Sequence, residues 1–204
     1  VLIITDRYYY NGKEINILER LPTILKKIKS IKNVLIISYP SKKNLKQKKI
    51  KGIKIFYYNK LKDKKKKIIF KKFDFDKELA ILYSSGTTGK PKCICHRAGG
   101  VLLQHLKEHK LHCDIKEGDN IFYFTTCGWM MWNWLMTFLA SKASIVLFDG
   151  FPMYKKNDLL LKIAEKEKIS LFGVSAKYID QLRKLNLIIK NKYKLKYLKI
   201  ICST

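Results

Sequence analysis

One glycine-rich stretch contains the residue types with the clearest chemical potential. Residues 84–92 directly follow an apolar run and combine hydroxyl side chains, two glycines and two lysines. Gly86 and Gly89 can adopt positive φ angles, so that consecutive backbone N–H groups converge on an anion. The hydroxyls add directional donors, and Lys90 adds positive charge. The stretch therefore predicts a loop that binds a polyphosphate.

This loop differs from the P-loop of nucleoside triphosphatases. The P-loop motif is GxxxxGK followed by Ser or Thr. Here Gly86-Thr87-Thr88-Gly89-Lys90 is followed by Pro91, which fixes its own φ and restrains the exit of the loop. The residue types thus predict phosphate binding without yet indicating the class of enzyme.

Alternating strand-like and helix-like segments surround the loop. Apolar runs of strand length cover residues 1–5, 33–38, 53–58, 79–83, 93–96, 121–126, 145–148, 171–173 and 198–202. Helical spacing and capping residues predict helices over residues 15–28, 99–111, 129–139, 157–167 and 175–185. This alternation predicts an α/β fold with a mostly parallel sheet and flanking helices. We expect the loop to lie between two strands of that sheet.

The same apolar patterns also predict which segments are buried. We expect residues 1–5 to form a buried strand and residues 7–13 to form a turn around their Asn-Gly pair. The helix over residues 129–139 is almost wholly apolar, which indicates burial on all sides. The helix over residues 99–111 is expected to gather its leucines on one side, namely Leu102, Leu103, Leu106 and Leu111.

The cysteines and histidines suggest neither a disulfide framework nor a strong metal site. The chain has five cysteines and no CxxC pair. His105, His109 and His112 with Cys113 could form a zinc cluster, because residues four apart share a helix face. However, His112 lies at the end of the predicted helix, and a structural or helix-end role for these histidines is favoured.

The formal net charge of +27 raises the possibility of a nucleic-acid partner. Nearly all of the excess is lysine, spread over predicted loops and helix faces, whereas arginine, which base readout favours, is scarce. The pattern favours a solvated surface over nucleic-acid binding. A basic module that grips nucleic-acid phosphate remains the alternative from a different functional class.

The chain starts and stops beside apolar runs, so we expect an internal piece of a longer protein. The sequence contains no signal peptide and no uninterrupted apolar run of about 18 residues. We therefore expect a cytoplasmic protein without a membrane span. The residues indicate no particular oligomeric state.

The motif over residues 83–92, Tyr-Ser-Ser-Gly-Thr-Thr-Gly-Lys-Pro-Lys, resembles the AMP-forming adenylating superfamily of acyl-CoA synthetases, luciferases and peptide-synthetase adenylation domains. Other stretches are similar to the acetoacetate–CoA ligase family within it. They cover residues 8–13, 73–74, 96–100, 105–107, 111–114 and 124–133. The resemblance is weakest over the lysine-rich residues 41–72.

The resemblance implies ATP-dependent activation of a short carboxylic acid, acetoacetate being favoured, through acyl-AMP and then transfer to CoA. ATP, the acid and CoA would be the small-molecule partners, with Mg²⁺ as the metal. By resemblance, the β- and γ-phosphates are held by Ser84, Ser85, Gly86, Thr87, Thr88, Gly89 and Lys90. Thr88 and Lys90 would be the catalytic residues, with Thr88 also contacting the metal. Lys92 is either a helper in phosphate binding or a surface charge.

The second motif implied by the resemblance borders the acyl pocket. Trp129, Met130 and Met131 are the candidate wall residues, whereas Trp134 and Leu135 are expected in the core. Residues 173–176 would form a strand-end loop on the nucleotide side of the cleft. Cys93 and Cys95 occupy places where the family usually has small or β-branched residues, and burial would make both of them inert packing thiols.

The resemblance also predicts how the chain is organised. Residues 1–204 would be part of the N-terminal AMP-binding domain, with residues 1–72 ending its first α/β half. Residues 73–204 would supply the phosphate loop and the second half. Since the adenine-binding, ribose-binding and C-terminal catalytic segments of the family lie beyond Thr204, we expect residues 1–204 alone to be inactive.

Overall fold

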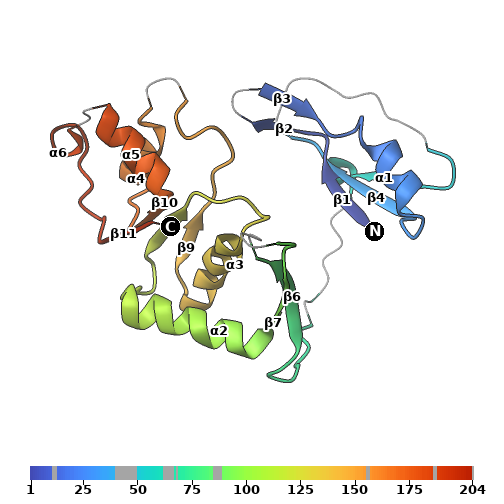
Figure 1. Ribbon diagram of the computed structural model, residues 1–204, viewed down its shortest axis with the longest axis horizontal. Coiled ribbons are helices and arrows are strands. Elements are labelled where there is room, and N and C mark those ends of the chain that lie inside the picture. The colour runs from blue at the N-terminus through green and yellow to red at the C-terminus, as the bar shows by residue number, and fades with distance from the viewer. Residues whose placement is uncertain are drawn as a thin grey trace. The chain divides into compact units, whose positions relative to one another are not determined.

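The structure, a computed structural model, describes residues 1–10, 13–39, 50–61, 67, 69–84, 89–154, 157–185 and 188–203. The chain divides into two compact units, of residues 1–69 with 149–151 and of residues 70–148 with 152–204. Each unit contains a parallel sheet with at least one flanking helix (Figure 1). The predicted α/β class is therefore confirmed. None of the described helices is both long and apolar enough to cross a membrane.

The first unit is a three-stranded parallel sheet covered by one helix. The strands are ordered β1-β4-β5, and a separate antiparallel pair is formed by β2 and β3. The elements are β1 (Leu2–Thr5), β2 (Arg7–Tyr10), β3 (Lys13–Asn16), α1 (Leu21–Lys27), β4 (Asn33–Ile37), β5 (Lys54–Tyr57) and the 3₁₀ turn η1 (Tyr58–Lys60). Leu21 and Leu25 of α1 pack on Val34 and Ile36 of β4, which makes the core.

Three predictions for the first unit were wrong. Residues 7–10 are a strand instead of a turn, because Tyr8 pairs with Ile15 across the β2–β3 hairpin. The helix consequently begins at Leu21 instead of at residue 15, since tertiary pairing overrides helical spacing. The strand β1 is only partly buried, because its side chains alternate between the two faces of the sheet and Ile3 is 62% exposed.

The second unit is built on a four-stranded, all-parallel sheet ordered β11-β10-β8-β9. Its strands are β8 (Asn120–Tyr123), β9 (Ser144–Val146), β10 (Leu171–Val174) and β11 (Ile200–Ser203). A separate hairpin consists of β6 (Glu78–Tyr83) and β7 (Cys93–Arg97). The helices and helical turns are α2 (Ala98–Lys107), η2 (Glu108–His112), α3 (Met130–Thr137), η3 (Phe138–Ser141), α4 (Leu159–Lys166), α5 (Ala176–Lys184) and α6 (Ile189–Lys192).

Helices cover both faces of this sheet, as its continuous apolar strands require. Phe122 and Phe172 point to one face, where α4 and α5 form the core with Leu160 and Tyr178. The intervening positions of the strands point to the other face, where they pack against α3, η3 and the segment after η2. The second unit is thus a three-layer arrangement of helices, sheet and helices.

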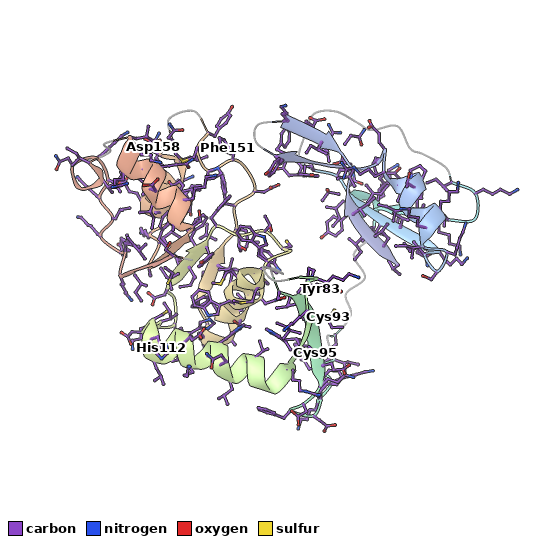
Figure 2. The ribbon with its side chains drawn as sticks, viewed as in Figure 1. Tyr83, Cys93, Cys95, His112, Phe151 and Asp158 are labelled. Carbon is purple, nitrogen blue, oxygen red and sulfur yellow. The ribbon has the colours of Figure 1, made fainter. Side chains whose placement is uncertain are left out.

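A buried carboxylate joins two helices on the first of these faces. Asp158, which precedes α4, is 1% exposed and accepts from the Nζ of Lys192 at 2.8 Å, with the Nζ of Lys162 at 3.0 Å (Figure 2). The Tyr193 hydroxyl also donates to this carboxylate. Burial opposes ionisation, but the bonds from Lys192, Tyr193 and Lys162 outweigh it and hold the pKa of Asp158 far below its usual range.

Two expectations about helix burial were wrong in this unit. The leucines expected to line one side of α2 and η2 are mostly exposed, and the buried side chains are instead His105 and His109. These histidines are four residues apart and face α3, which decides the buried side of the helix. The α3–η3 segment is not buried all round either, because Trp129, Met130 and Leu139 are exposed.

Candidate functional site

The glycine-rich loop is the connection of an antiparallel hairpin. The last paired residues of β6 and β7 are Tyr83 and Cys93. One position further, the Ser84 N–H donates to the Lys92 carbonyl at 3.0 Å, and the Lys92 N–H donates to Ser84 Oγ at 3.0 Å. These two hydrogen bonds close the base of a seven-residue loop, residues 85–91. The expectation that the loop joins two strands of the parallel sheet was wrong.

The predicted loop residues are only partly within the described chain. Ser85, Gly86, Thr87 and Thr88 lie outside the described residues. Gly89 has φ of 153°, inside the left-handed region that only glycine enters easily. The ideal position of a Cβ on Gly89 meets nothing within 4 Å, so backbone conformation is what requires glycine there.

The lysines and the first serine of the loop have different surroundings. Lys90 and Lys92 are exposed at the two sides of Pro91. Ser84 Oγ already accepts from the Lys92 backbone, which gives Ser84 a structural task at the loop base. Its hydroxyl hydrogen can still be donated, because a serine oxygen both donates and accepts. The geometry therefore gives Lys92 a definite backbone role, whatever its side chain contributes.

The candidate pocket residues start the α3 helix, close to the carboxyl end of β8. The Phe124 N–H donates to the Gly173 carbonyl at 2.9 Å, and the Trp129 N–H donates to the Thr126 carbonyl at 3.1 Å. Open parallel α/β sheets bind ligands beyond the carboxyl ends of their strands. Trp129 therefore follows the part of the sheet where a ligand is expected.

Exposure separates the pocket candidates from the core residues of α3. Trp129 is 59% and Met130 48% exposed, and Met131 is partly buried against the core. Trp134 is 7% and Leu135 1% exposed. The core assignment of Trp134 and Leu135 is confirmed, and the pocket assignment of the preceding residues stays a prediction.

The end of β10 has a close approach that requires glycine. An ideal Cβ on Gly173 would lie 2.0 Å from Cδ2 of Tyr123, whose ring crosses from β8. Directly after β10, Ser175 caps α5, and its Oγ accepts from the Tyr178 N–H at 3.3 Å. The predicted helix start at Ser175 is confirmed, whereas the nucleotide-side role of residues 173–176 stays a prediction.

A polar network that the sequence did not predict lies beneath α3. The Trp134 indole Nε1–H donates to Glu108 Oε2 at 2.7 Å, and Gln104 Nε2 donates to the other oxygen of Glu108. Burial opposes ionisation of Glu108, but the bonds from Gln104 and Trp134 outweigh it and lower its pKa. The available signal is the spacing of Gln104 and Glu108, which are four residues apart on one helix beside His105 and His109.

The histidines do not form a zinc site. Within the described ranges, no group of three or more His, Cys, Asp and Glu side chains could hold a metal ion. His105 and His109 are buried, whereas His112 is exposed at the end of the helix remote from Cys93 and Cys95 (Figure 2). Burial, with a smaller contribution from His105, lowers the pKa of His109 to about 4. His109 is therefore neutral at pH 7, which suits a packing role.

The five cysteines are all free thiols. Cys93 and Cys95 are exposed on β7, so the burial that would make them inert packing thiols is absent at both positions. They are two residues apart on one strand and share a face of a hairpin that has no covering layer on that side among the described residues. Cys202 on β11 is instead partly buried beside Cys113, and burial raises its pKa to about 11.

Comparison with known proteins extends the likeness over the whole chain. The sequence profile described as "AMP-binding enzyme" matches residues 1–203. Acetoacetyl-coenzyme A synthetase of Rhizobium meliloti (strain 1021) is 39% identical over 211 residues, covering 100% of this chain and 31% of the relative. Acetoacetyl-CoA synthetase of Gallus gallus is 41% identical over 199 residues, covering 96% of this chain and 30% of the relative.

A solved structure shares the fold as well. The acetoacetyl-CoA synthetase from Streptomyces lividans superposes with a TM-score of 0.86 at 33% sequence identity, covering 99% of this chain and 30% of that one. The chain thus spans about a third of the length of these relatives. Since the family profile matches nearly every residue, the chain belongs to the AMP-binding enzyme family.

Proposed function

We propose that this chain is part of an AMP-forming acid–CoA ligase whose acid is acetoacetate. The observation that supports this most is the match of residues 1–203 to the AMP-binding family, together with relatives named acetoacetyl-CoA synthetase at 39% and 41% identity. The reaction belongs to the full-length protein, and we expect residues 1–204 alone to be inactive. The cytoplasmic location expected from the sequence stays a prediction.

The proposed reaction has two half-steps. A carboxylate oxygen of the acid attacks the α-phosphorus of ATP, the bond from that phosphorus to the bridging oxygen breaks, and acyl-AMP and pyrophosphate form. The CoA thiolate then attacks the acyl carbon and displaces AMP. In the first half-step negative charge grows on the departing pyrophosphate, so donors placed there stabilise the transition state more than the ground state.

The hairpin loop is the proposed binding site for the β- and γ-phosphates. Ser84, Ser85, Thr87, Thr88 and Lys90 would supply donors and positive charge, with backbone N–H groups of Gly86 and Gly89 between them. The closed base formed by Ser84 and Lys92 supports this assignment, because it holds the two ends of the loop at a fixed separation. Because the two ends are already held, ATP binding has fewer backbone torsions to order at the base of the loop.

Mg²⁺ would neutralise phosphate charge when bound with ATP, with Thr88 as its proposed protein ligand. Magnesium usually keeps several waters and takes most remaining ligands from phosphate oxygens, so a single hydroxyl suits it better than a cage of side chains. Trp129, Met130 and Met131 are the proposed wall of the acid pocket. The exposure of Trp129 and Met130 at the start of α3 supports this, because pocket walls must be free to contact a ligand.

The test is acetoacetate-dependent exchange of pyrophosphate into ATP by the full-length protein. We expect Lys90→Ala combined with Thr88→Ala to abolish or sharply reduce exchange, because both substitutions remove phosphate contacts. Lys107→Ala is the matched control, since it removes one exposed lysine from α2 and is expected to leave exchange unchanged. Unchanged exchange in the double variant would refute the loop assignment.

Substrate identity has its own test. Thioester formation from a panel of short acids and CoA should rank acetoacetate above acetate, propionate and butyrate. If another short acid ranks far above acetoacetate, the enzyme is a ligase for that acid. If no acid supports exchange and the protein instead binds nucleic acid with a steep salt dependence, the basic-module alternative holds.

A further inference from the structure

The α3 helix is hydrogen-bonded to η2 and α2 through two of its residues, Trp134 and Thr137. The Trp134 side chain donates from indole Nε1 to Glu108 Oε2 at 2.7 Å. The Trp134 backbone carbonyl accepts from the Thr137 hydroxyl at 2.7 Å, and Thr137 Oγ1 in turn lies 3.0 Å from His105 Nδ1. The Trp134 indole N–H is therefore bonded directly to Glu108 of η2, and the Trp134 carbonyl is linked to His105 of α2 through the Thr137 hydroxyl.

These bonds define the proton arrangement of the network. A threonine hydroxyl has one hydrogen, and here Thr137 gives it to the Trp134 carbonyl. His105 must then be the donor to Thr137, which assigns its hydrogen to Nδ1. Burial also lowers the pKa of His105, so the ring is neutral at pH 7. The network therefore has a single directional pattern from His105 through Thr137 to Trp134.

Aromatic packing holds the Trp134 ring on its other sides. Ring centroids lie 4.6 Å from Phe138, 5.2 Å from His109 and 5.9 Å from Tyr123, all with edge-to-face geometry. Tyr123 is the residue that crosses Gly173 at the end of β10. The Trp134 indole is thus enclosed between η2, η3 and the sheet, with its N–H directed at one carboxylate oxygen.

The position of Trp134 within α3 couples it to the proposed pocket wall. Met130 and Met131 precede it by four and three residues, so they lie one helical turn away on the neighbouring surface. The α3 helix has eight residues, and its cap residue Trp129 makes no side-chain capping bond to the described first turn. Among the described residues, side-chain hydrogen bonds therefore hold this short helix at Trp134 and Thr137 and not at its N-terminal cap.

We propose that Glu108 is a positioning residue for the acid pocket, acting through the Trp134 indole to set the rotation of α3 and hence the placement of Trp129, Met130 and Met131. This inference rests on the proposed function, since it needs those residues to contact the acid. Glu108 itself contacts no reacting atom. Loss of its carboxylate should weaken acid binding while leaving the phosphate loop on the β6–β7 hairpin intact.

The decisive comparison uses three substitutions on the same helical segment of the full-length protein. Glu108→Ala removes the acceptor for Trp134, and we expect the KM for acetoacetate to rise by about tenfold, as for a lost buried hydrogen bond. The KM for ATP should change less than twofold. Glu108→Gln keeps a carbonyl acceptor and should restore the acetoacetate KM to near the wild-type value.

Gln104→Ala is the matched control. It removes the bond to the other oxygen of Glu108 but leaves the bond to Trp134 in place, and Gln104 is exposed. We expect its acetoacetate KM to match that of the wild type. A rise equal to that of Glu108→Ala would overturn the proposal, because the acetoacetate KM would then rise with the bond between Glu108 and the Trp134 indole still in place.

Trp134→Phe examines the same bond from its other end and serves if Glu108→Ala does not fold. It keeps an aromatic ring in the enclosed site but removes the N–H donor together with part of the indole ring system, so the acetoacetate KM should again rise with the KM for ATP nearly constant. Wild-type activity with an unchanged acetoacetate KM in Trp134→Phe overturns the positioning role. Absence of acetoacetate-dependent activity in the wild type refutes the proposed function instead.

Discussion

Two adjacent glycines at the start of α2 should respond in opposite directions to the same substitution. Gly99 and Gly100 both lie in the first turn of the helix. An ideal Cβ on Gly99 would lie 2.2 Å from Cδ2 of Phe75, whereas a Cβ on Gly100 meets nothing within 4 Å. The Phe75 backbone is held in place, because its carbonyl accepts from the Gly99 N–H at 2.9 Å.

The magnitudes follow from two opposing effects. Alanine in a helix is more favourable than glycine by roughly 0.5–1 kcal/mol, so Gly100→Ala should raise the free energy of unfolding by about 0.5 kcal/mol. At Gly99 the ring must move by more than 1 Å to restore an ordinary carbon–carbon contact of about 3.5–4.0 Å. Overpacking costs about 1–3 kcal/mol, and the low end applies because Phe75 is 60% exposed and can rotate into solvent.

The helix gain applies to both alanines, so we expect Gly99→Ala to be less stable than Gly100→Ala by the overpacking cost alone, about 1 kcal/mol, which corresponds to a Tm difference of roughly 2–4 °C for a chain of this size. Far-UV circular dichroism during heating measures the difference, and urea unfolding checks it. Phe75→Leu should shrink the penalty of Gly99→Ala in a double-mutant cycle. Equal stabilities of the two alanine variants would refute the steric reasoning.

Three further predictions concern the second unit. Gly173→Ala should lower the urea midpoint by an amount equivalent to about 2 kcal/mol, because its Cβ would meet the Tyr123 ring at 2.0 Å; a midpoint unchanged from the wild type would contradict the close approach. Asp158→Asn should cost about 2 kcal/mol at pH 7. The folded-state pKa of Asp158 is depressed, so its contribution to the free energy of unfolding is complete above the usual aspartate pKa of about 3.9 and declines as the pH falls below it. The wild type should therefore lose its greater stability relative to Asp158→Asn on acidification from pH 5 to pH 2, as measured by urea titration at each pH. Ser175→Ala should cost about 1 kcal/mol and Ser175→Asp much less, since only alanine removes the acceptor for the Tyr178 N–H; equal losses in thermal unfolding would argue against a capping role.

Local chemistry explains the predictions that were confirmed. Ser175 caps α5 because its own oxygen reaches a backbone N–H three residues away, which needs no distant partner. The strands β8 and β10 were found from their apolar runs, since both faces of a parallel sheet are covered by helices. The prediction of Trp134 and Leu135 as core residues is confirmed, because apolar side chains in the second half of this helix are stabilised by burial against the sheet.

Distant contacts explain the predictions that were wrong. Ile15 has helical spacing to the residues after it, yet it pairs with Tyr8 across a hairpin. Leu111 has the residue type of a core position, but it is 75% exposed because His109 faces α3 instead. The spacing of apolar residues predicts which residues share a face of a helix or strand, but it does not predict which face packs against the rest of the fold.

The candidate site shows the same difference between features that depend on local sequence and features that depend on distant contacts. The sequence by itself determined the glycine-rich loop, its lysines and the aromatic motif at Trp129, because these depend on residue type and spacing over about ten residues. Only the tertiary structure decided that the loop closes an antiparallel hairpin through Ser84 and Lys92. It also decided that Glu108 holds the Trp134 indole across 26 positions of sequence. Hydrogen bonds between residues so far apart form only when packing brings their elements together, and local sequence patterns contain no information on that partnership.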